Sequence, residues 1–382
     1  MKYLFTFLTL FTLFTFVTFS TTHAQKFTLN GYISDSLSGE ALTSASVTIK
    51  EVGKSISANQ YGFYSLTLSQ GNYQLIFSYI GYQPKVVEIN LIRNTSQNIA
   101  LEPVSATINE VTVSARKKES NTKSAQMGKI DLNINTIKSL PVIFGEVDVL
   151  KTLQLLPGVR NAGEGNAGFY VRGGGPDQNL IMLDEAVVYN TGHLFGFFSV
   201  FNSDAIKSIS LIKGGMPPQY GGRLSSVIDI TMKEGNMNKT EVDAGIGLIA
   251  SRIAIQGPIK KDKASYMLSA RRTYIDALIK PFISKSSSFY GSGYYFYDLN
   301  AKMNYRFTDK DRIYLSGYFG RDKFIFNNAR RSFTTSIPWG NSTATFRWNH
   351  VFNKKLFSNL TLVYNDYKFD FFGTQDNFKI NL

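Results

Sequence analysis

The feature that most constrains this chain is the strict alternation of apolar and polar residues in its last third. Between Tyr295 and Phe307 every second residue is apolar, and Asp298, Asn300 and Lys302 stand at alternate positions. Successive side chains of a strand point to opposite faces, so one face is expected to be apolar and the other polar. Strands of soluble sandwiches average only about five or six residues, which this run exceeds. The pattern is typical of a transmembrane β-barrel wall.

Other segments of the region 237–382 carry the same alternation. The aligned apolar positions are Val242, Ala244, Ile246, Leu248, Ile253, Ile255, Ala264, Tyr266, Leu268, Ala270, Ile313, Leu315, Phe319, Ala344, Phe346, Trp348, Phe352, Leu360, Leu362 and Tyr364. Their parity slips near Ala250, which predicts a hairpin between two strands. We expect roughly seven antiparallel strands of the ~10-residue type found in outer-membrane barrels.

The predicted connections between these strands alternate in length. Those at 257–262, 308–311 and 353–355 are short, whereas those at 273–293 and 323–338 are long. Outer-membrane barrels have short periplasmic turns and long extracellular loops. A plugged barrel needs about 22 strands, and 370–382 is a polar, irregular ending. We therefore expect a partial barrel, and a fragment that cannot transport alone.

The first residues predict export. Met1 and Lys2 give a positive start, 4–19 is apolar, and Thr22-His23-Ala24 is a plausible cleavage site. The apolar run is shorter than the ~20 residues of a spanning helix. We expect 1–24 to be a signal peptide, and the mature chain to lie in the cell outer membrane with its N-terminal domain in the periplasm.

Composition excludes several classes of protein and site. There is no cysteine, so disulfides and thiolate metal sites are excluded, and the three histidines argue against a histidine-rich metal site. No spacing of Ser, His and Asp or of paired carboxylates predicts catalysis, so we expect no enzyme, no cofactor and no metal. The net charge of +13 fits contact with nucleic acid or with anionic lipid headgroups. Because Lys and Arg form no long run, we expect outer-membrane lipid and not nucleic acid as the partner.

The segment 25–102 alternates with a period of two over short runs such as 27–33, 46–50, 64–68 and 73–79, which turn signals separate. This pattern predicts a β-sandwich. The residues GYISDSLSGEALTSASVTIK and NQYGFYSLTLSQGNYQLIFSYIGYQPKVVEINL resemble the carboxypeptidase-regulatory-like domain. That domain often precedes the plug in receptors of the Bacteroidota, and the resemblance implies no catalytic role.

A longer stretch, 127–233, combines a helical pattern at 146–156, ended by Pro157-Gly158, with strands and glycine turns. Its motifs are PGV at 157, YVRGGG at 170–175, LDE at 183–185, DAIKSISLIKGG at 204–215 and YGGRLSSVIDI at 220–230. Together they resemble the plug domain of TonB-dependent outer-membrane receptors. The resemblance implies an α+β plug over 126–236 inside a barrel. It also implies active uptake of a nutrient such as a siderophore, glycan, peptide or vitamin.

The same resemblance gives several residues of the plug a structural role. They are Arg172, Gly173, Gly174, Asp184, Lys213, Gly214, Gly215, Gly221, Gly222 and Arg223. We expect Arg172 to be buried, and the glycines to permit positive φ in tight turns. No GK[ST] follows Gly173-Gly174-Gly175, so a phosphate loop is excluded. We expect Asp184 and Glu185, as neighbours on one strand, to point to opposite faces and to share no chemistry.

Between sandwich and plug lies a polar linker, 103–125, that contains a β-prone octapeptide. Its residues are Ile108, Asn109, Glu110, Val111, Thr112, Val113, Ser114 and Ala115. Such a segment can add a strand to a partner's sheet edge through main-chain hydrogen bonds. It resembles a TonB box, which implies the TonB energy-transducing complex as a partner. An ordinary linker strand is the alternative.

The run from Tyr189 to Phe198 is rich in aromatic residues and glycine and follows a strand predicted at 180–188. Loop aromatics on a rigid scaffold suit recognition, so Tyr189 and His193 are candidates to face an imported small molecule or oligomer. Packing against the barrel wall is the alternative for His193, and the stronger one for Phe197 and Phe198. At the level of the whole chain, the alternative to a transport receptor is an exported β-rich adhesion or interaction protein.

Overall fold

The computed structural model describes residues 25–104, 128–140, 145–163, 166–288, 290–328, 332–375 and 378–381. The chain divides into two compact units: Met1–Ser34 with Ala41–Leu101, and Asp35–Glu40 with Glu102–Leu382. The signal peptide expected at 1–24 and the octapeptide at 108–115 lie outside the described residues. Each unit is described by itself.

The first unit is the expected sandwich of two sheets. One sheet has the order β4-β1-β7, with β8 also paired to β1, and the other has the order β3-β2-β5-β6. The strands are β1 Lys26–Asp35, β2 Ser46–Ile49, β3 Lys54–Ser57, β4 Phe63–Ser69, β5 Gly71–Ser78, β6 Lys85–Leu91, β7 Thr95–Ser96 and β8 Ile99–Leu101. Alternate residues of the two sheets, among them Leu29, Val47, Leu66 and Phe77, form one apolar core.

The plug within the second unit is built on a mixed five-stranded sheet with the order β13-β12-β17-β16-β9. Its strands are β9 Lys129–Asn133, β12 Asn179–Leu183, β13 Ala186–Val187, β16 Ile206–Ile212 and β17 Ser226–Met232. Only β12 and β17 run parallel. Short pairs formed by β10 Val159–Asn161 with β11 Phe169–Val171, and by β14 Gly192–His193 with β15 Phe198–Ser199, complete the plug.

Two short helices pack on this sheet, α3 Ile134–Lys138 and α4 Val149–Leu153. The helix predicted over 146–156 is therefore shorter than expected. Asp148 caps it by accepting hydrogen bonds from the Leu150 and Lys151 amides, and its second oxygen accepts one from the Ser199 amide at 2.9 Å. Asp148 thus both caps the helix and binds β15. Because Asp148 has an extended backbone as the cap, the helix begins at Val149 and not at Glu146.

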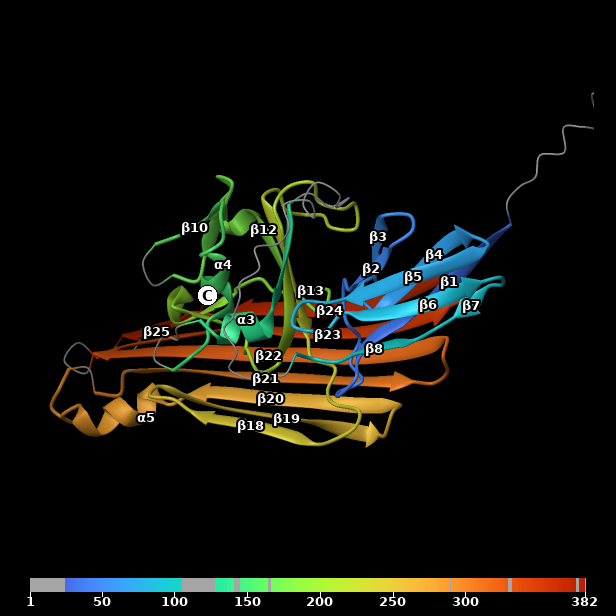
Figure 1. Cartoon of the computed structure of the whole chain (residues 1–382). Coiled ribbons are helices and arrows are strands. Elements are labelled where there is room, and N and C mark those ends of the chain that lie inside the picture. The colour runs from blue at the N-terminus through green and yellow to red at the C-terminus, as the bar shows by residue number, and fades with distance from the viewer. Residues whose placement is uncertain are drawn as a thin grey trace, which may run out of the picture. The chain divides into compact units, whose positions relative to one another are not determined.

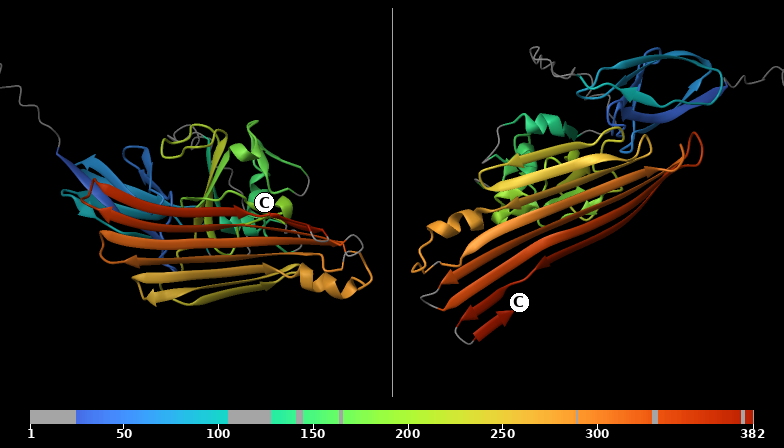
Figure 2. Two further views of the ribbon diagram at one scale, coloured as in Figure 1. Left: turned by 180° about the vertical axis from the view of Figure 1, so that it is seen from behind. Right: turned by 90° about the horizontal axis from the view of Figure 1, so that it is seen from below.

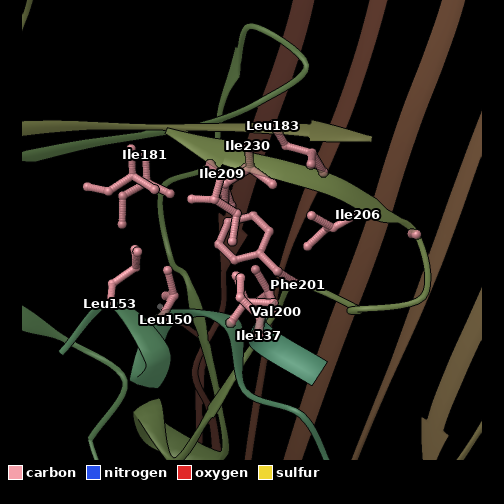
Figure 3. Packing of buried hydrophobic residues seen from close by; sticks show 14 of the residues in the cluster. Ile137, Leu150, Leu153, Ile181, Leu183, Val200, Phe201, Ile206, Ile209 and Ile230 are labelled. Atoms are coloured by element: carbon pink, nitrogen blue, oxygen red, sulfur yellow. The ribbon is translucent and has the colours of Figure 1, made fainter. Parts of the chain in front are cut away.

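The core of the plug is apolar. Figure 3 shows Ile137 of α3 and Leu150 and Leu153 of α4 facing Ile209 and Ile230 of the sheet, with Phe201 between the layers. All of these side chains are at most 2% exposed. Two side chains of the following strands, Met267 and Tyr318, also belong to this cluster. Shortening any one of these closely packed side chains would leave a cavity and destabilise the plug.

The remaining strands form an antiparallel wall with the order β18-β19-β20-β21-β22-β23-β25-β26, in which β24 also pairs with β23. Its strands are β18 Glu241–Ile246, β19 Ala250–Lys260, β20 Ala264–Thr273, β21 Gly293–Arg306, β22 Asp311–Asn328, β23 Phe333–Val351, β24 Phe357–Phe369, β25 Phe372–Gln375 and β26 Phe378–Asn381. The plug lies on one face of this wall, and the other face is uncovered (Figures 1 and 2). We call these the inner and outer faces.

The wall agrees with the predicted alternation but differs in its details. The hairpin near Ala250 and the connection at 273–293 are confirmed, and the latter holds α5 Ile275–Ile279 and η3 Lys280–Phe282. The long connection predicted at 323–338 is wrong, because β22 and β23 continue into it and pair up to Asn328 and Phe333. Among the described residues there are nine strands rather than seven, since 372–381 adds the hairpin of β25 and β26.

Across the described ranges, no helix is long and apolar enough to cross a membrane.

Candidate functional site

The inner face of the wall is polar although the plug buries it. Asp298, Asn300, Lys302 and Asn304 alternate along β21 and are each at most 5% exposed. The same parity on β22 and β23 places Asp322, Asn341 and Arg347 under the plug. Burying a polar group costs free energy unless the group forms hydrogen bonds or ion pairs. The candidate site therefore lies among the polar contacts between plug and wall.

His193, at the end of β14, occupies the centre of this contact. Its Nε2 lies 2.9 Å from Asp298 Oδ1 and its Nδ1 2.7 Å from Asp322 Oδ2. The ring stacks on Phe296 with 3.9 Å between ring centroids and is 1% exposed. Both nitrogens face carboxylate oxygens, so both must carry a proton, which makes the side chain an imidazolium.

The charge of His193 follows from its surroundings. Burial lowers the pKa of a histidine, but the carboxylates of Asp298 and Asp322 outweigh burial and raise the pKa of His193 to about 9. The Tyr318 hydroxyl donates to Asp298 at 2.9 Å, and the Tyr294 hydroxyl donates to Asp322. The histidine is therefore charged at neutral pH and held from both sides.

His193 is one member of a series of eight side chains of alternating sign, which we call the charge chain. In order they are Lys138, Asp204, Arg252, Glu146, Arg271, Asp298, His193 and Asp322. Successive members are 2.5, 2.7, 3.7, 3.7, 2.6, 2.9 and 2.7 Å apart. With His193 protonated, the four cations and four anions cancel.

Plug and wall contribute equally to the charge chain. Lys138, Glu146, His193 and Asp204 belong to the plug, and the other four members to β19–β22. Burial raises the pKa of Asp204, but its hydrogen bond to Lys138 and the charge of Arg252 outweigh burial and leave that pKa below its ordinary value. Each side is neutral by itself, so neither is left with a large net charge if the two separate.

A second contact of the same kind lies at the turn between β12 and β13. Asp184 Oδ2 is 2.8 Å from Lys302 Nζ, and Glu185 Oε1 is 3.1 Å from Arg347 Nη2. Burial raises the pKa of Asp184, but Lys302 and Arg347 lower it further than burial raises it. The strand predicted over 180–188 is thus a hairpin, and Asp184 and Glu185 are its turn, with φ of 47° and 73°. They do not share chemistry, because each binds a different cation of the wall.

The loop between β13 and β15 brings aromatic residues to the surface. Tyr189 is 56% exposed, its amide donates to Asn341 Oδ1 at 3.2 Å, and its ring lies 6.5 Å from that of Tyr367. Phe195 is 63% exposed, has a φ of 55°, and its ring lies 5.2 Å from that of Trp339. A positive φ at a bulky residue is strained and is maintained by its surroundings.

These positions revise the sequence-based expectations for the loop. His193 does not face the surface, because Asp298 and Asp322 bind both of its nitrogens, and its predicted contact with a ligand is replaced by packing against the wall. Phe198 is buried, as the packing alternative predicts. Tyr189 keeps its exposure and remains a candidate. Phe195 was not among the predicted ligand-facing residues, although it lies in the same aromatic run as Tyr189.

None of the plug-motif residues is a member of the charge chain. Gly173, Gly214, Gly215 and Gly222 have positive φ, whereas Gly174 and Gly221 do not. A Cβ at Gly174 would lie 2.4 Å from that of Ser225, so the requirement there is close approach. Lys213 is buried and donates to the Pro157 carbonyl at 2.5 Å; burial and the charge of Arg172 lower its pKa. Arg223 donates to its neighbour, the Gly222 carbonyl, at 2.9 Å.

Arg172 corrects one expectation. It was predicted to be buried against carbonyls or wall carboxylates, but it is exposed, with a φ of 49°. Arg172 follows β11 in a turn closed by hydrogen bonds between Val171 and Gly174, and its guanidinium lies beside Gly214, where a Cβ would be 2.8 Å from Arg172 Nη1.

Among the described residues, no group of three or more His, Asp or Glu side chains is placed to hold a metal ion.

Sequence reasoning did not select Glu146, Asp204, Arg252, Arg271 or Asp322. The alternation of polar and apolar residues could have indicated Arg271 and Asp322. Both stand at inward positions of strands whose outward positions are largely apolar. The partners of these residues were not readable, because they lie far away in the sequence.

A plug packed on one face of an amphipathic antiparallel wall is the arrangement found in plugged β-barrels. Comparison with protein families identifies two domains. Residues 29–113 match the CarboxypepD_reg-like domain, and residues 142–227 match the TonB-dependent Receptor Plug Domain. The chain thus carries a plug domain of the kind found in TonB-dependent receptors, preceded by a carboxypeptidase-regulatory-like domain. A search of curated protein sequences finds no match.

Solved structures with similar folds include three receptors or transporters. The siderophore receptor PirA from Acinetobacter baumannii is 18% identical, with a TM-score of 0.39 over 65% of this chain and 45% of that one. The outer membrane transporter YddB from Escherichia coli is 13% identical, with a TM-score of 0.48 over 65% and 40%. The copper transporter OprC is 12% identical, with a TM-score of 0.44 over 64% and 37%. The chain thus spans less than half the length of these proteins.

Proposed function

We propose that this chain is the plug-bearing part of a receptor that imports a nutrient across the outer membrane, using force that TonB applies to residues 108–115. The observation that carries the proposal is the polar contact between plug and wall. An apolar contact of this area would expose hydrocarbon to water each time it opened. A contact of charged and hydrogen-bonding groups can be rehydrated, so it opens at lower cost.

The charge chain suits a plug that must be retained and then moved. Removing one inner member takes away one of the opposite charges that each of its neighbours contacts, which costs up to about 3–5 kcal/mol. Displacing all members together returns both neutral sets to water, where each ion is solvated. The arrangement therefore disfavours the loss of a single contact but permits the plug to move as a whole. A force applied at the linker requires such movement.

The substrate of the proposed importer is a small molecule or oligomer such as a siderophore, glycan, peptide or vitamin. Support for its recognition comes from the exposed rings of Tyr189 and Phe195, which lie on a loop fixed to the wall by Asn341. Substitution of both by alanine should lower ligand affinity in cells while the plug stays folded. Unchanged affinity would remove these two residues as contacts.

The absence of cysteine gives a direct test of TonB coupling. Single substitutions Val111→Cys and Val113→Cys should each form a disulfide with cysteines placed along the sheet edge of the TonB C-terminal domain. Ser120→Cys, in the polar part of the same linker, is the matched control. Adding Val113→Pro to the Val111→Cys variant, or Val111→Pro to the Val113→Cys variant, should abolish the adduct. Proline removes a backbone hydrogen-bond donor and disfavours strand pairing.

The outcomes separate the proposal from its alternative. Adducts confined to 111 and 113 and lost with proline support strand addition to TonB. Equal adducts at 120, or adducts that survive proline, would show that 108–115 is an ordinary linker strand. A receptor that carries Val111→Pro should then import normally, whereas an adhesion or interaction protein should import nothing with or without the substitution.

A further inference from the structure

The outer face of the wall is uncharged along most of its height. Because the strands are in register, residues that pair across the sheet form rows on that face. One row consists of Leu268, Ala301, Gly317, Ala344 and Tyr364. The next row, nearer the connection between β20 and β21, consists of Ala270, Leu299, Phe319, Ser342 and Asp366. Leu268, Leu299, Phe319 and Tyr364 are 39–60% exposed. These rows match the apolar band of a membrane wall.

The row that follows is different, because every second strand brings a cation. It consists of Arg272, Tyr297, Arg321, Gly340 and Lys368. We call it the cationic row. The side chains of Arg272 and Lys368 are 62% and 75% exposed, and Arg321 is also exposed. Neighbouring strands are about 4.8 Å apart, so the three cations are spaced by roughly 10 Å and span roughly 20 Å.

Carboxylates only partly neutralise this row. Asp276 lies 3.9 Å from Arg272, and Asp366 lies 3.5 Å from Lys368. Lys323, two residues beyond Arg321 on β22, adds a fourth cation. Among the described residues, Arg321 and Lys323 have no carboxylate within ion-pair distance. Four cations and two carboxylates leave a net positive charge, which stands next to rows that are uncharged apart from Asp366, where a membrane surface would lie.

The cationic row lies at the end of the wall that bears the longest connection. Arg272 is the second-last residue of β20, just before the stretch 274–292 that joins β20 to β21, whereas the turns at the opposite ends of these strands are short. In outer-membrane barrels the long connections are extracellular. The row would thus lie at the level of the outer-leaflet headgroups, flanked by Tyr295 and Tyr297 as interfacial aromatic residues.

We infer that the cationic row binds the phosphate groups of a lipid in the outer leaflet. The acyl chains of this lipid would lie along the two neighbouring rows, those of Leu268 and Ala270. Three cations at regular spacing match a headgroup that carries more than one phosphate, since a single phosphate reaches only one of them. The apolar surface immediately next to the row favours a lipid over free phosphate. This site is separate from the plug and the charge chain, so it goes beyond the proposed import function.

The test uses the full chain in detergent, with diphosphoryl lipid A as the probe and native mass spectrometry as the measurement of lipid retention. The row variant is Arg272→Gln/Arg321→Gln/Lys368→Gln. The matched control is Lys261→Gln/Lys310→Gln/Lys355→Gln, which removes three exposed cations from turns at the opposite ends of the strands. Retention should fall by roughly tenfold or more in the row variant and by less than about twofold in the control.

Further arms decide between sources of phosphate and between charge and folding. Phosphatidylethanolamine should be retained equally by the native chain and the row variant, and inorganic phosphate at the same concentration should not displace lipid A. Arg321→Lys in the native background should keep most of the retention, and circular dichroism should be the same for all variants. Equal losses in row and control variants would overturn the inference, as would displacement by inorganic phosphate.

Discussion

The plug has two boundaries that differ in chemistry. Between its sheet and its helices lie only apolar side chains, such as Leu150, Phe201 and Ile209. Between the plug and the wall lie Glu146, Asp298 and the rest of the charge chain. Apolar packing holds the plug together as a body, whereas the charge chain, beside a cluster of Phe198 with Phe296 and Trp339 of the wall, holds that body in place. The difference implies that the plug leaves the wall more easily than it unfolds.

The largest expected effect comes from breaking the apolar boundary. Phe201→Ala removes a side chain that is 2% exposed in the plug core, which should cost about 4 kcal/mol of unfolding free energy. Denaturant unfolding of the full chain in detergent, followed by hydrogen exchange in β16 and β17, measures it. Tyr189→Ala, at an exposed site, is the control. A cost below about 1 kcal/mol would show that the plug core contributes little.

Breaking the polar boundary should have a smaller and differently placed effect. Asp298→Asn removes one of the two carboxylates that Arg271 and His193 each contact and leaves them only Glu146 and Asp322, which should cost about 3 kcal/mol. Hydrogen exchange should increase in the loop 189–199, where the Tyr189 and Leu194 amides donate to the wall, while β16 and β17 stay protected. Asp309→Asn, in an exposed turn, is the matched control. Loss of protection throughout the plug would mean that the two boundaries are not independent.

His193 makes the polar boundary sensitive to pH. Its pKa is raised to about 9 in the folded chain, against about 6.5 in an unfolded one. Protonation therefore stabilises the contact fully below about pH 6.5, and this stabilisation is lost as the pH rises through about 9. The carboxylates that face His193 are Asp298 and Asp322, with Arg271, Tyr294 and Tyr318 around them.

The size of the pH effect should be on the order of 2–3 kcal/mol. Thermal unfolding of the full chain between pH 6 and pH 10 measures it. His193→Gln should abolish the dependence in this range, whereas His350→Gln, at the opposite end of the wall strands, should keep it. A dependence that persists without His193 would assign it to another group.

The smallest effect is expected at Arg172. Because this side chain is exposed, Arg172→Ala should change the free energy of unfolding by less than about 0.5 kcal/mol. Chemical denaturation is sufficient to measure it. A cost above about 2 kcal/mol would restore the buried role that the sequence motif suggested.

Local patterns predicted the strands better than the contacts between them. The alternation around Leu299, Met303 and Tyr305 gave both the strand and its outward face. The extension of β22 and β23 was missed, because Asn327, Asn328 and Ser332 suggest a loop, whereas pairing between two long strands overrides that preference.

The candidate site was less predictable, since its geometry depends on distant partners. His193 looked like a surface residue of an aromatic loop. Its environment is set by Asp298 and Asp322, which follow it by 105 and 129 positions. No spacing rule connects such positions, so the charge chain emerges only when plug and wall are placed together. Parity identified the inward charges but not their partners.

Native-state hydrogen exchange of the full chain at increasing denaturant tests most directly whether the plug separates from the wall as a folded body. The amides of Tyr189 and Leu194, which donate to Asn341 and Tyr294 of the wall, report on the polar boundary. The amides of Ile209, Leu211 and Ile230 report on the plug core. We predict that the first group exchanges through an opening at clearly lower denaturant than the second. Exchange of both groups in one common step would contradict the account, because plug and wall would then open only by unfolding together.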